Sequence, residues 1–275
     1  MSAAEAVISD TEPAYAHYAA AVMRARDATA LVFDDLPPLL PGAVPEAIEI
    51  AGLAALCWPV PKAWFDQESV EHRLGDPDWV AARALAHHRL VEALAPAGPA
   101  VPLRFGSVHA ERDGVITMLH SRAARWTAAL DRLDGAAEWT LTVETAAHGP
   151  GAGEASPSAA ASGAAYLKAQ ARARNAAAER QSRLRNRLTA LHETLSRYAR
   201  AVTIRDPGKA ARAHGAPPPV FRAAYLLPHG DIDVARCVCA DRAAAWADDG
   251  VRLALDGPLP AFVLAPLLLE GSNDA

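Results

Sequence analysis

The chain has few cysteines and no apolar run long enough for a membrane helix. Its three cysteines, Cys57, Cys237 and Cys239, form no even set for a disulfide framework, which is typical of reduced thiols in a cytoplasmic protein. Cys237 and Cys239 are one residue apart and have no CxxC partner, so we expect no zinc site. The apolar stretch Phe262 to Leu269 is interrupted by Pro266 and is far shorter than the ~20 residues of a membrane helix.

We expect no secretory signal at the N-terminus, because Glu5, Asp10 and Glu12 occur there and no basic cluster precedes an apolar run. With 51% hydrophobic and 21% charged residues, the composition is that of a folded soluble protein. The length of 275 residues leaves room for two domains, each with its own core. We expect a soluble, cytoplasmic, two-domain protein.

Charge is unevenly distributed along the chain. The net charge of −5 and the pI near 6.1 argue against a chain that coats nucleic acid or anionic membranes as a whole. Residues 168–200, however, contain nine Lys or Arg and two acids, a charge of +7, which leaves −12 for the rest of the chain. This basic segment predicts a solvated helix face or a surface for an acidic partner.

Catalytic signatures are also missing. The sequence has no GxSxG, HExxH or P-loop motif, and no GxGxxG after a strand. The run Gly149 to Gly153 lacks the Lys and the Ser or Thr of a phosphate loop. His87 and His88 are neighbours, and on a helix they point about 100° apart and cannot chelate one ion together. We expect no catalytic, cofactor-binding or metal residues, and we interpret His87, on the apolar stripe, as a buried, hydrogen-bonded histidine.

The second half of the chain alternates between strand and helix patterns. Residues 148–163 are rich in Gly, Ala, Pro and Ser and predict a mobile linker. The periodicity predicts strands at 139–143, 202–205, 220–227 and 251–255, and helices at 162–200 and about 231–247. This β-α-β-β-α-β order predicts a ferredoxin-like split βαβ domain with an antiparallel sheet.

The helix expected at 162–200 would be about 60 Å long at 1.5 Å per residue. Its apolar positions are spaced 4, 3, 4, 3 and 4 apart, which is the spacing of a coiled-coil seam. The seam consists of Leu184, Leu188, Leu191, Leu195, Tyr198 and Val202. This pattern predicts a partner helix.

The first half predicts strands at 18–23, 47–50 and 53–60, then a helix from Asp76-Pro77 to Leu94 with Asp76 as its N-cap. A strand at 101–108 and a helix at about 113–133 follow. The predicted fold class is α+β. It has two domains: a modified ferredoxin-like domain at 1–134 and the ferredoxin-like domain with its long helix at 135–275.

The segment Val101 to Val108 contains one Arg in an otherwise apolar run. Because a guanidinium in an apolar setting needs acceptors for its five donors, we expect Arg104 to be paired as a structural clamp, with an acidic or carbonyl partner. Gly106 permits a positive φ or a close backbone approach.

Six segments, in order, resemble motifs of the gas vesicle protein F/L (GvpF/GvpL) family, and the resemblance covers most of residues 47–262. They are His88-x-x-Val91-Glu92, Val101 to Val108, Glu138 to Val143, Ser162 to Lys168, Ala224 to Leu226 and Gly257 to Phe262. The last motif departs from the family pattern, because Leu259 and Ala261 stand where the family usually has larger aromatic residues.

The resemblance implies a non-catalytic, chaperone-like accessory protein of gas vesicle assembly. Its partners would be the hydrophobic gas vesicle shell protein (GvpA type) and other gas vesicle accessory proteins, in the cytoplasm and in association with the vesicle. We expect the N-terminal domain to face the shell subunit, and we expect no nucleic acid or membrane partner. The candidate partner-binding residues are His88, Arg104, Phe105, Gly106, Tyr166, Leu184, Leu188, Leu191 and Leu195.

Two alternatives remain open at this point. The first is an RNA-binding ferredoxin-like module that uses the basic helix 168–200, with Trp139, Phe221 and Tyr225 as sheet aromatics although no stacking motif accompanies them. The second is an enzyme, which a pocket with convergent titratable groups would favour.

Overall fold

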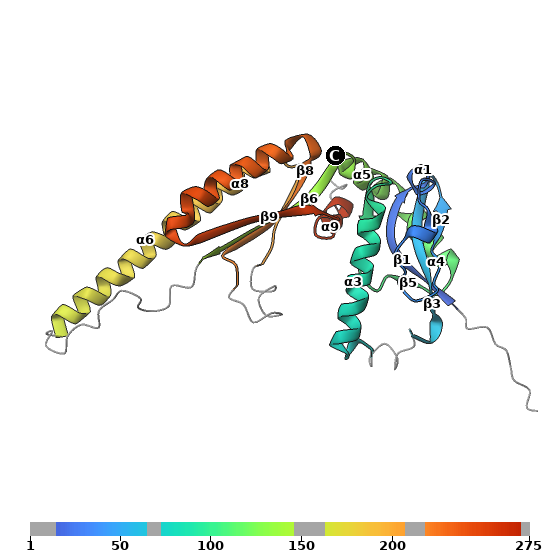
Figure 1. Cartoon of the computed structure of the whole chain (residues 1–275), viewed down its shortest axis with the longest axis horizontal. Helices are drawn as coiled ribbons and strands as arrows, with labels where there is room; N and C mark the ends of the chain where they lie inside the picture. The colour runs from blue at the N-terminus through green and yellow to red at the C-terminus, as the bar shows by residue number, and fades with distance from the viewer. Residues whose placement is uncertain (1–14, 65–72, 146–162, 207–217, 271–275) are drawn as a thin grey trace, which may run out of the picture. The chain divides into compact units, whose positions relative to one another are not determined.

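The computed structural model describes residues 15–64, 73–145, 163–206 and 218–270 (Figure 1). The chain divides into unit 1, Met1–Gly135 with Leu259–Ala275, and unit 2, Ala136–Pro258. Both units combine helices with antiparallel strands, so the expected α+β class is confirmed. The chain leaves unit 1 after Gly135, next to the boundary expected at 134, but the described residues 259–270 belong with unit 1 and not with the C-terminal unit.

Unit 1 is built on the sheet β2-β3-β1-β4, with β5 also paired to β1. The strands are β1 (Tyr15–Arg24), β2 (Glu46–Ile50), β3 (Leu53–Pro61), β4 (Ala100–Pro102) and β5 (Val108–His109). Consecutive residues 18–23 of β1 are all buried, so helices must cover both faces of this central strand. The run Ala19 to Ala21 suits this position because small side chains let helices approach closely from both sides.

Helix α3 (Pro77–Leu94) covers one face of this sheet through Leu90, Val91 and Leu94. It begins as expected, because the Asp76 carboxylate accepts hydrogen bonds from the backbone N–H groups of Asp78 and Trp79. Pro77 occupies the first helical position, where a missing N–H costs nothing.

The helix expected over 113–133 is two helices, α4 (Arg112–Ser121) and α5 (Ala123–Leu133). Arg122 breaks the helical path with φ −130° and ψ 24°. The indole N–H of Trp126 donates to the Met118 carbonyl at 3.3 Å and satisfies an acceptor that the break leaves free. The single-helix prediction was wrong because the break contains no Pro or Gly; side-chain hydrogen bonds from Ser121 and Trp126 to the Met118 carbonyl stabilise it.

Unit 2 has the expected β-α-β-β-α-β element order and the sheet β7-β8-β6-β9, with β8 antiparallel to β6 and β7. Its elements are β6 (Ala136–Thr145), α6 (Gly163–Ser196), β7 (Ala201–Ile204), β8 (Phe221–Pro228), α8 (Ile232–Trp246) and β9 (Val251–Leu259). Numbered within each unit, both sheets follow the path 2-3-1-4. The linker expected at 148–163 lies outside the described residues except for Gly163, which opens α6.

The leucines of the expected coiled-coil seam pack on the unit's own sheet. Leu188, Leu191 and Leu195 are buried in one core with Trp139, Leu141 and Tyr225, and Leu184, Tyr198 and Val202 pack against that core. The partner helix predicted from their spacing is therefore not needed to cover them. A 3-4 spacing creates one apolar stripe, and a sheet can cover that stripe as well as a second helix can.

The chain ends its described part in unit 1 with α9 (Ala265–Glu270), which contacts α5. Ala261, Leu264 and Leu268 are buried, so this short segment is part of the core of unit 1. Among the described residues, no helix is both long and apolar enough to cross a membrane.

Candidate functional site

The segment expected as one strand over 101–108 is an edge strand interrupted by an outward turn. Leu103 donates its backbone N–H to the Ala20 carbonyl, and the Ser107 carbonyl accepts from the Ala19 N–H, so both ends of the turn pair with β1. Between them, Arg104, Phe105 and Gly106 leave the sheet and are exposed. Gly106 has φ +85°, the left-handed conformation that the sequence suggested.

The clamp predicted for Arg104 is wrong. Its side chain is exposed, and its guanidinium contacts no acceptor among the described residues. Arg24 is a paired arginine of unit 1: its Nη2 lies 2.7 Å from Asp131 and its Nη1 lies 3.1 Å from Asp134. The hydrogen bond to Asp131 is the main cause that raises the pKa of Arg24. Arg24 joins the end of β1 to α5.

His87 is the buried, hydrogen-bonded histidine that its place on the apolar stripe predicted. Its Nδ1 lies 2.8 Å from the Tyr18 hydroxyl, and its Nε2 lies 3.2 Å from the Leu103 carbonyl. A carbonyl only accepts, so Nε2 must donate to it, and Nδ1 of the neutral ring then accepts the hydroxyl proton. Burial is the largest cause that lowers the pKa of His87, which keeps this neutral form at pH 7.

The hydroxyl of Tyr18 also reaches the outward turn, where the Gly106 N–H donates to it at 3.5 Å. The ring of Phe105 packs edge-on against Tyr18 and His87, with centroid distances of 6.5 and 6.1 Å. Contacts with the buried Tyr18 and His87 therefore hold the exposed turn in place.

His88, one of the candidate residues, lies beside this network but does not enter it. Its ring stacks on Phe262 at a centroid distance of 5.5 Å, and its Nε2 lies 3.6 Å from Glu92. Phe262 also contacts the ring of His87 at 5.5 Å. The two histidines have different hydrogen-bond or ion-pair partners, but both rings contact Phe262, in the segment that returns to unit 1.

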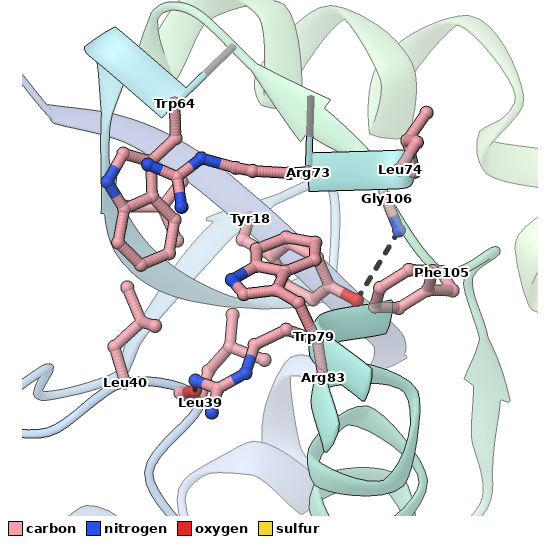
Figure 2. Close-up of a pocket in the computed structure, with 11 residues that line it drawn as sticks. Tyr18, Leu39, Leu40, Trp64, Arg73, Leu74, Trp79, Arg83, Phe105 and Gly106 are labelled. Carbon is pink, nitrogen blue, oxygen red and sulfur yellow. Dashed lines mark hydrogen bonds between the residues drawn. The ribbon is translucent and has the colours of Figure 1, made fainter. Parts of the chain in front are cut away.

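A cavity of about 300 Å³ opens beside the outward turn (Figure 2). Its walls are almost wholly apolar. They come from β1, the loop after residue 36, β3, residues 64, 73 and 74, α3 and the outward turn. The lining residues are Tyr18, Leu39, Leu40, Val60, Trp64, Arg73, Leu74, Trp79, Arg83, Phe105 and Gly106. Leu74 and Phe105 remain exposed at 60% and 37%.

Phe105 and Gly106 were expected from the sequence as partner-binding residues, whereas Trp64, Trp79, Arg73 and Arg83 were not. The meeting of these residues with Tyr18 depends on long-range packing that no local pattern contains.

The other candidate residues do not gather at this cavity. Tyr166 is exposed on α6, Leu188, Leu191 and Leu195 belong to the core of unit 2, and Leu184 packs against that core. Trp139 and Tyr225, offered as stacking platforms for RNA, are buried in that core, and Phe221 packs against it. The RNA-binding alternative thus loses the exposed aromatic sheet on which it depended.

The described residues contain no group of three or more His, Cys, Asp or Glu that could hold a metal ion. Cys57 and Cys239 are buried and Cys237 is exposed, and all three are free thiols. Burial raises the pKa of Cys57 to about 12, so this thiol is not an activated nucleophile.

Fold and cavity together define an α+β protein with two units and an apolar cavity on unit 1. The sequence profile described as gas vesicle synthesis protein GvpL/GvpF matches residues 17–263, and the chain belongs to this family. It is 33% identical over 241 residues to gas vesicle protein L from a Streptomyces species, an alignment that covers 85% of this chain and 87% of that protein. The family is a gas vesicle assembly family and not a known enzyme family.

Two crystal structures of gas vesicle protein GvpF share the fold. The protein from an Anabaena species matches with a TM-score of 0.61 at 16% identity, covering 91% of this chain and 96% of that one. The protein from Microcystis aeruginosa matches with a TM-score of 0.57 at 14% identity, covering 91% of this chain and 98% of that one. The architecture of this chain is therefore that of GvpF.

Proposed function

We propose that this protein is a non-catalytic accessory factor that binds the hydrophobic shell subunit of gas vesicles and assists shell formation. Family membership supports a part in gas vesicle formation. A subunit that forms an apolar-lined shell would aggregate if it were released uncovered, so a protein that covers its apolar surface during assembly has a clear use. We place this activity in the cytoplasm, in association with vesicles and other gas vesicle proteins.

The observation that carries the proposal is the apolar cavity on unit 1 with exposed Leu74 and Phe105 at its mouth. Large apolar side chains beside a concave aromatic surface are typical of protein interaction sites. We therefore assign shell-subunit binding to unit 1, as the sequence analysis expected for the N-terminal domain.

We also propose that both units are variants of the ferredoxin-like split βαβ fold. The shared strand path and the β-α-β-β-α-β order of unit 2 support this assignment. Unit 1 differs from the usual ferredoxin-like fold in the connection from β1 to β2. This connection contains α1 (Ala25–Ala28) and the short 3-10 helix η1 (Phe33–Asp35) in place of a long helix.

A matched pair of leucines tests the proposed function. Leu74 at the cavity and Leu167 on α6 are exposed at 60% and 64%, so a charge costs little folding stability at either position. We expect Leu74→Glu to reduce capture of co-expressed shell subunit by about tenfold, because it places a charge in an apolar contact. Leu167→Glu should leave capture unchanged.

The readout is the amount of shell subunit that co-purifies with the tagged full-length chain. Loss of capture by Leu167→Glu, with capture retained by Leu74→Glu, would place the binding surface on unit 2 and refute the assignment to unit 1. Retention by both variants would refute a role for the cavity.

A further inference from the structure

Two arginines line the cavity on unit 1, and each has a buried N–H group without a hydrogen-bond acceptor among the described residues. The guanidinium of Arg73 lies over the ring of Trp64, 4.3 Å from its centroid, and 5.7 Å from that of Trp79 (Figure 2). Arg83 donates from Nη1 to the Leu39 carbonyl at 2.8 Å. The Nε atoms of both side chains are buried and have no acceptor among the described residues.

Stacking on a tryptophan face holds a guanidinium without using its hydrogen-bond donors, because all five N–H groups lie in the plane of the group. Arg73 is thus fixed in position by stacking that occupies none of its N–H groups. Neither Arg73 nor Arg83 forms an ion pair with a described carboxylate. A carboxylate brought by a ligand would complete a planar, bidentate pair at this position.

The rest of the cavity selects an apolar group. Trp64, Trp79, Tyr18, Leu39 and Val60 line it, and the volume of about 300 Å³ is at the small end of the range for ligand pockets. This volume suits one large apolar side chain better than an extended cofactor. The exposed Leu74 and Phe105 continue the apolar surface beyond the mouth, which favours a polypeptide over a free small molecule.

We propose that this cavity binds a short linear segment of a protein partner in which a large apolar side chain is followed by a carboxylate. The apolar side chain fills the space between Trp79 and Tyr18, and the carboxylate pairs with Arg73. This inference deepens the proposed function, on which it rests in taking the partner to be a protein, and it names the chemistry that the partner must present.

Synthetic peptides separate the two requirements. The full-length chain is titrated with a blocked octapeptide that contains two leucines followed by two glutamates, and binding is measured by calorimetry. Matched peptides replace the glutamates by glutamines or the leucines by serines. We expect the first peptide to bind with a dissociation constant of about 1 mM or lower. Each replacement should raise this constant about tenfold.

The variant Arg73→Gln connects this selectivity to the cavity. It should weaken binding of the glutamate peptide about tenfold and leave binding of the glutamine peptide unchanged, because only the carboxylate contact is removed. Arg185→Gln is the matched control, since Arg185 is an exposed arginine on α6. Circular dichroism melting confirms that each variant is folded.

Equal affinity for the glutamate and glutamine peptides, or equal weakening of both by Arg73→Gln, would overturn the inference. The absence of any peptide binding would also overturn it. Each of these results is distinct from failure of the proposed function, because shell-subunit capture is measured separately. Capture that depends on Leu74 without peptide selectivity would keep the proposed function and remove only the ligand chemistry stated here.

Discussion

The hydroxyl of Tyr18 joins β1, α3 and the outward turn at residues 104–106, because it contacts both His87 and Gly106. Removing it in Tyr18→Phe leaves Nδ1 of a buried histidine without a donor. We expect the free energy of unfolding to fall by about 1–3 kcal/mol, measured by chemical denaturation. Tyr166→Phe, which changes an exposed tyrosine on α6, is the control and should lie within about 0.5 kcal/mol of the wild type. Equal effects of the two variants would contradict this account.

His87 gives unit 1 a dependence on pH. Burial lowers its pKa in the folded state, whereas in the unfolded chain the ring titrates near its ordinary value of about 6.5. Below that value the unfolded state takes up a proton that the folded state resists, so stability is complete above pH 7 and falls as the solution is acidified.

The variant His87→Gln removes this titration and should flatten the curve of unfolding free energy against pH between 7.5 and 5. Part of the slope will remain, because burial also lowers the pKa of His109. Curves of identical slope for the variant and the wild type would show that His87 does not carry the effect.

Residue-scale prediction from the sequence succeeded where the partners are near in sequence. Asp76 caps α3 through N–H groups two and three residues away, and the motif Asp-Pro is sufficient to identify it. Pairing was predicted for Arg104 and not for Arg24, because the partners of Arg24, Asp131 and Asp134, lie more than a hundred residues away in the sequence. Nothing around Arg24 or Arg104 in the sequence tells which of the two meets an acid.

At the scale of elements, α6 combines a packed half and an exposed half in one helix. Leu191 is buried against the sheet of unit 2, whereas Leu167 is exposed at 64%. We expect Leu191→Ala to cost about 2–5 kcal/mol, from lost burial and a residual cavity. Leu167→Ala should change the unfolding free energy by less than about 0.5 kcal/mol.

Thermal or chemical denaturation of the two variants measures both values. If the leucines of α6 instead served a coiled coil between chains, the cost of Leu191→Ala would depend on protein concentration. Concentration-independent destabilisation is the result expected for a seam that lies in the unit's own core.

A second element-scale prediction concerns β9, which passes close to β6 at Gly257. A Cβ atom at this position would lie 2.6 Å from the ring of Trp139, a buried side chain that cannot move aside easily. We expect Gly257→Ala to destabilise unit 2 by about 1–3 kcal/mol through overpacking. A melting temperature equal to the wild type would show that the strand shifts freely.

The sequence predicted most strands and helices because their signals are local: alternation in 139–143, the Asp-Pro start of α3, and the absence of Pro and Gly in α6 after Gly163. It did not predict the break at Arg122 or the interruption of the 101–108 strand. The break depends on a side-chain hydrogen bond from Trp126 that no Pro or Gly signals, and the interruption depends on long-range contacts with Tyr18 and His87.

At the scale of the whole molecule, residues 259–270 belong to unit 1 although unit 2 precedes them in the chain. Phe262 contacts the rings of His87 and His88, and Leu264 and Leu268 are buried. A chain truncated after Pro258 should therefore lose stability in unit 1. Hydrogen exchange is expected to rise in β1 and to remain unchanged in β8. Faster exchange in β8 alone would contradict the assignment.

The cavity also belongs to the scale of the whole molecule, because its lining comes from β1, β3, α3 and the outward turn. Tyr18 and Gly106, two of its lining residues, are 88 residues apart in the sequence. Family motifs pointed to Phe105 and Gly106, yet Trp64 and Arg73 carry no motif. Such a site follows from the complete fold and could not be assembled from the sequence patterns.

The discontinuity of unit 1 has a consequence for the order of folding during synthesis. Translation proceeds at about 5–20 residues per second, and residues 136–258 leave the ribosome before the segment that packs on His87 and α5. Unit 2 has its whole sequence available at that time, whereas unit 1 still lacks Phe262, Leu264 and Leu268. The unit that carries the cavity is thus the last to be completed on a newly made chain.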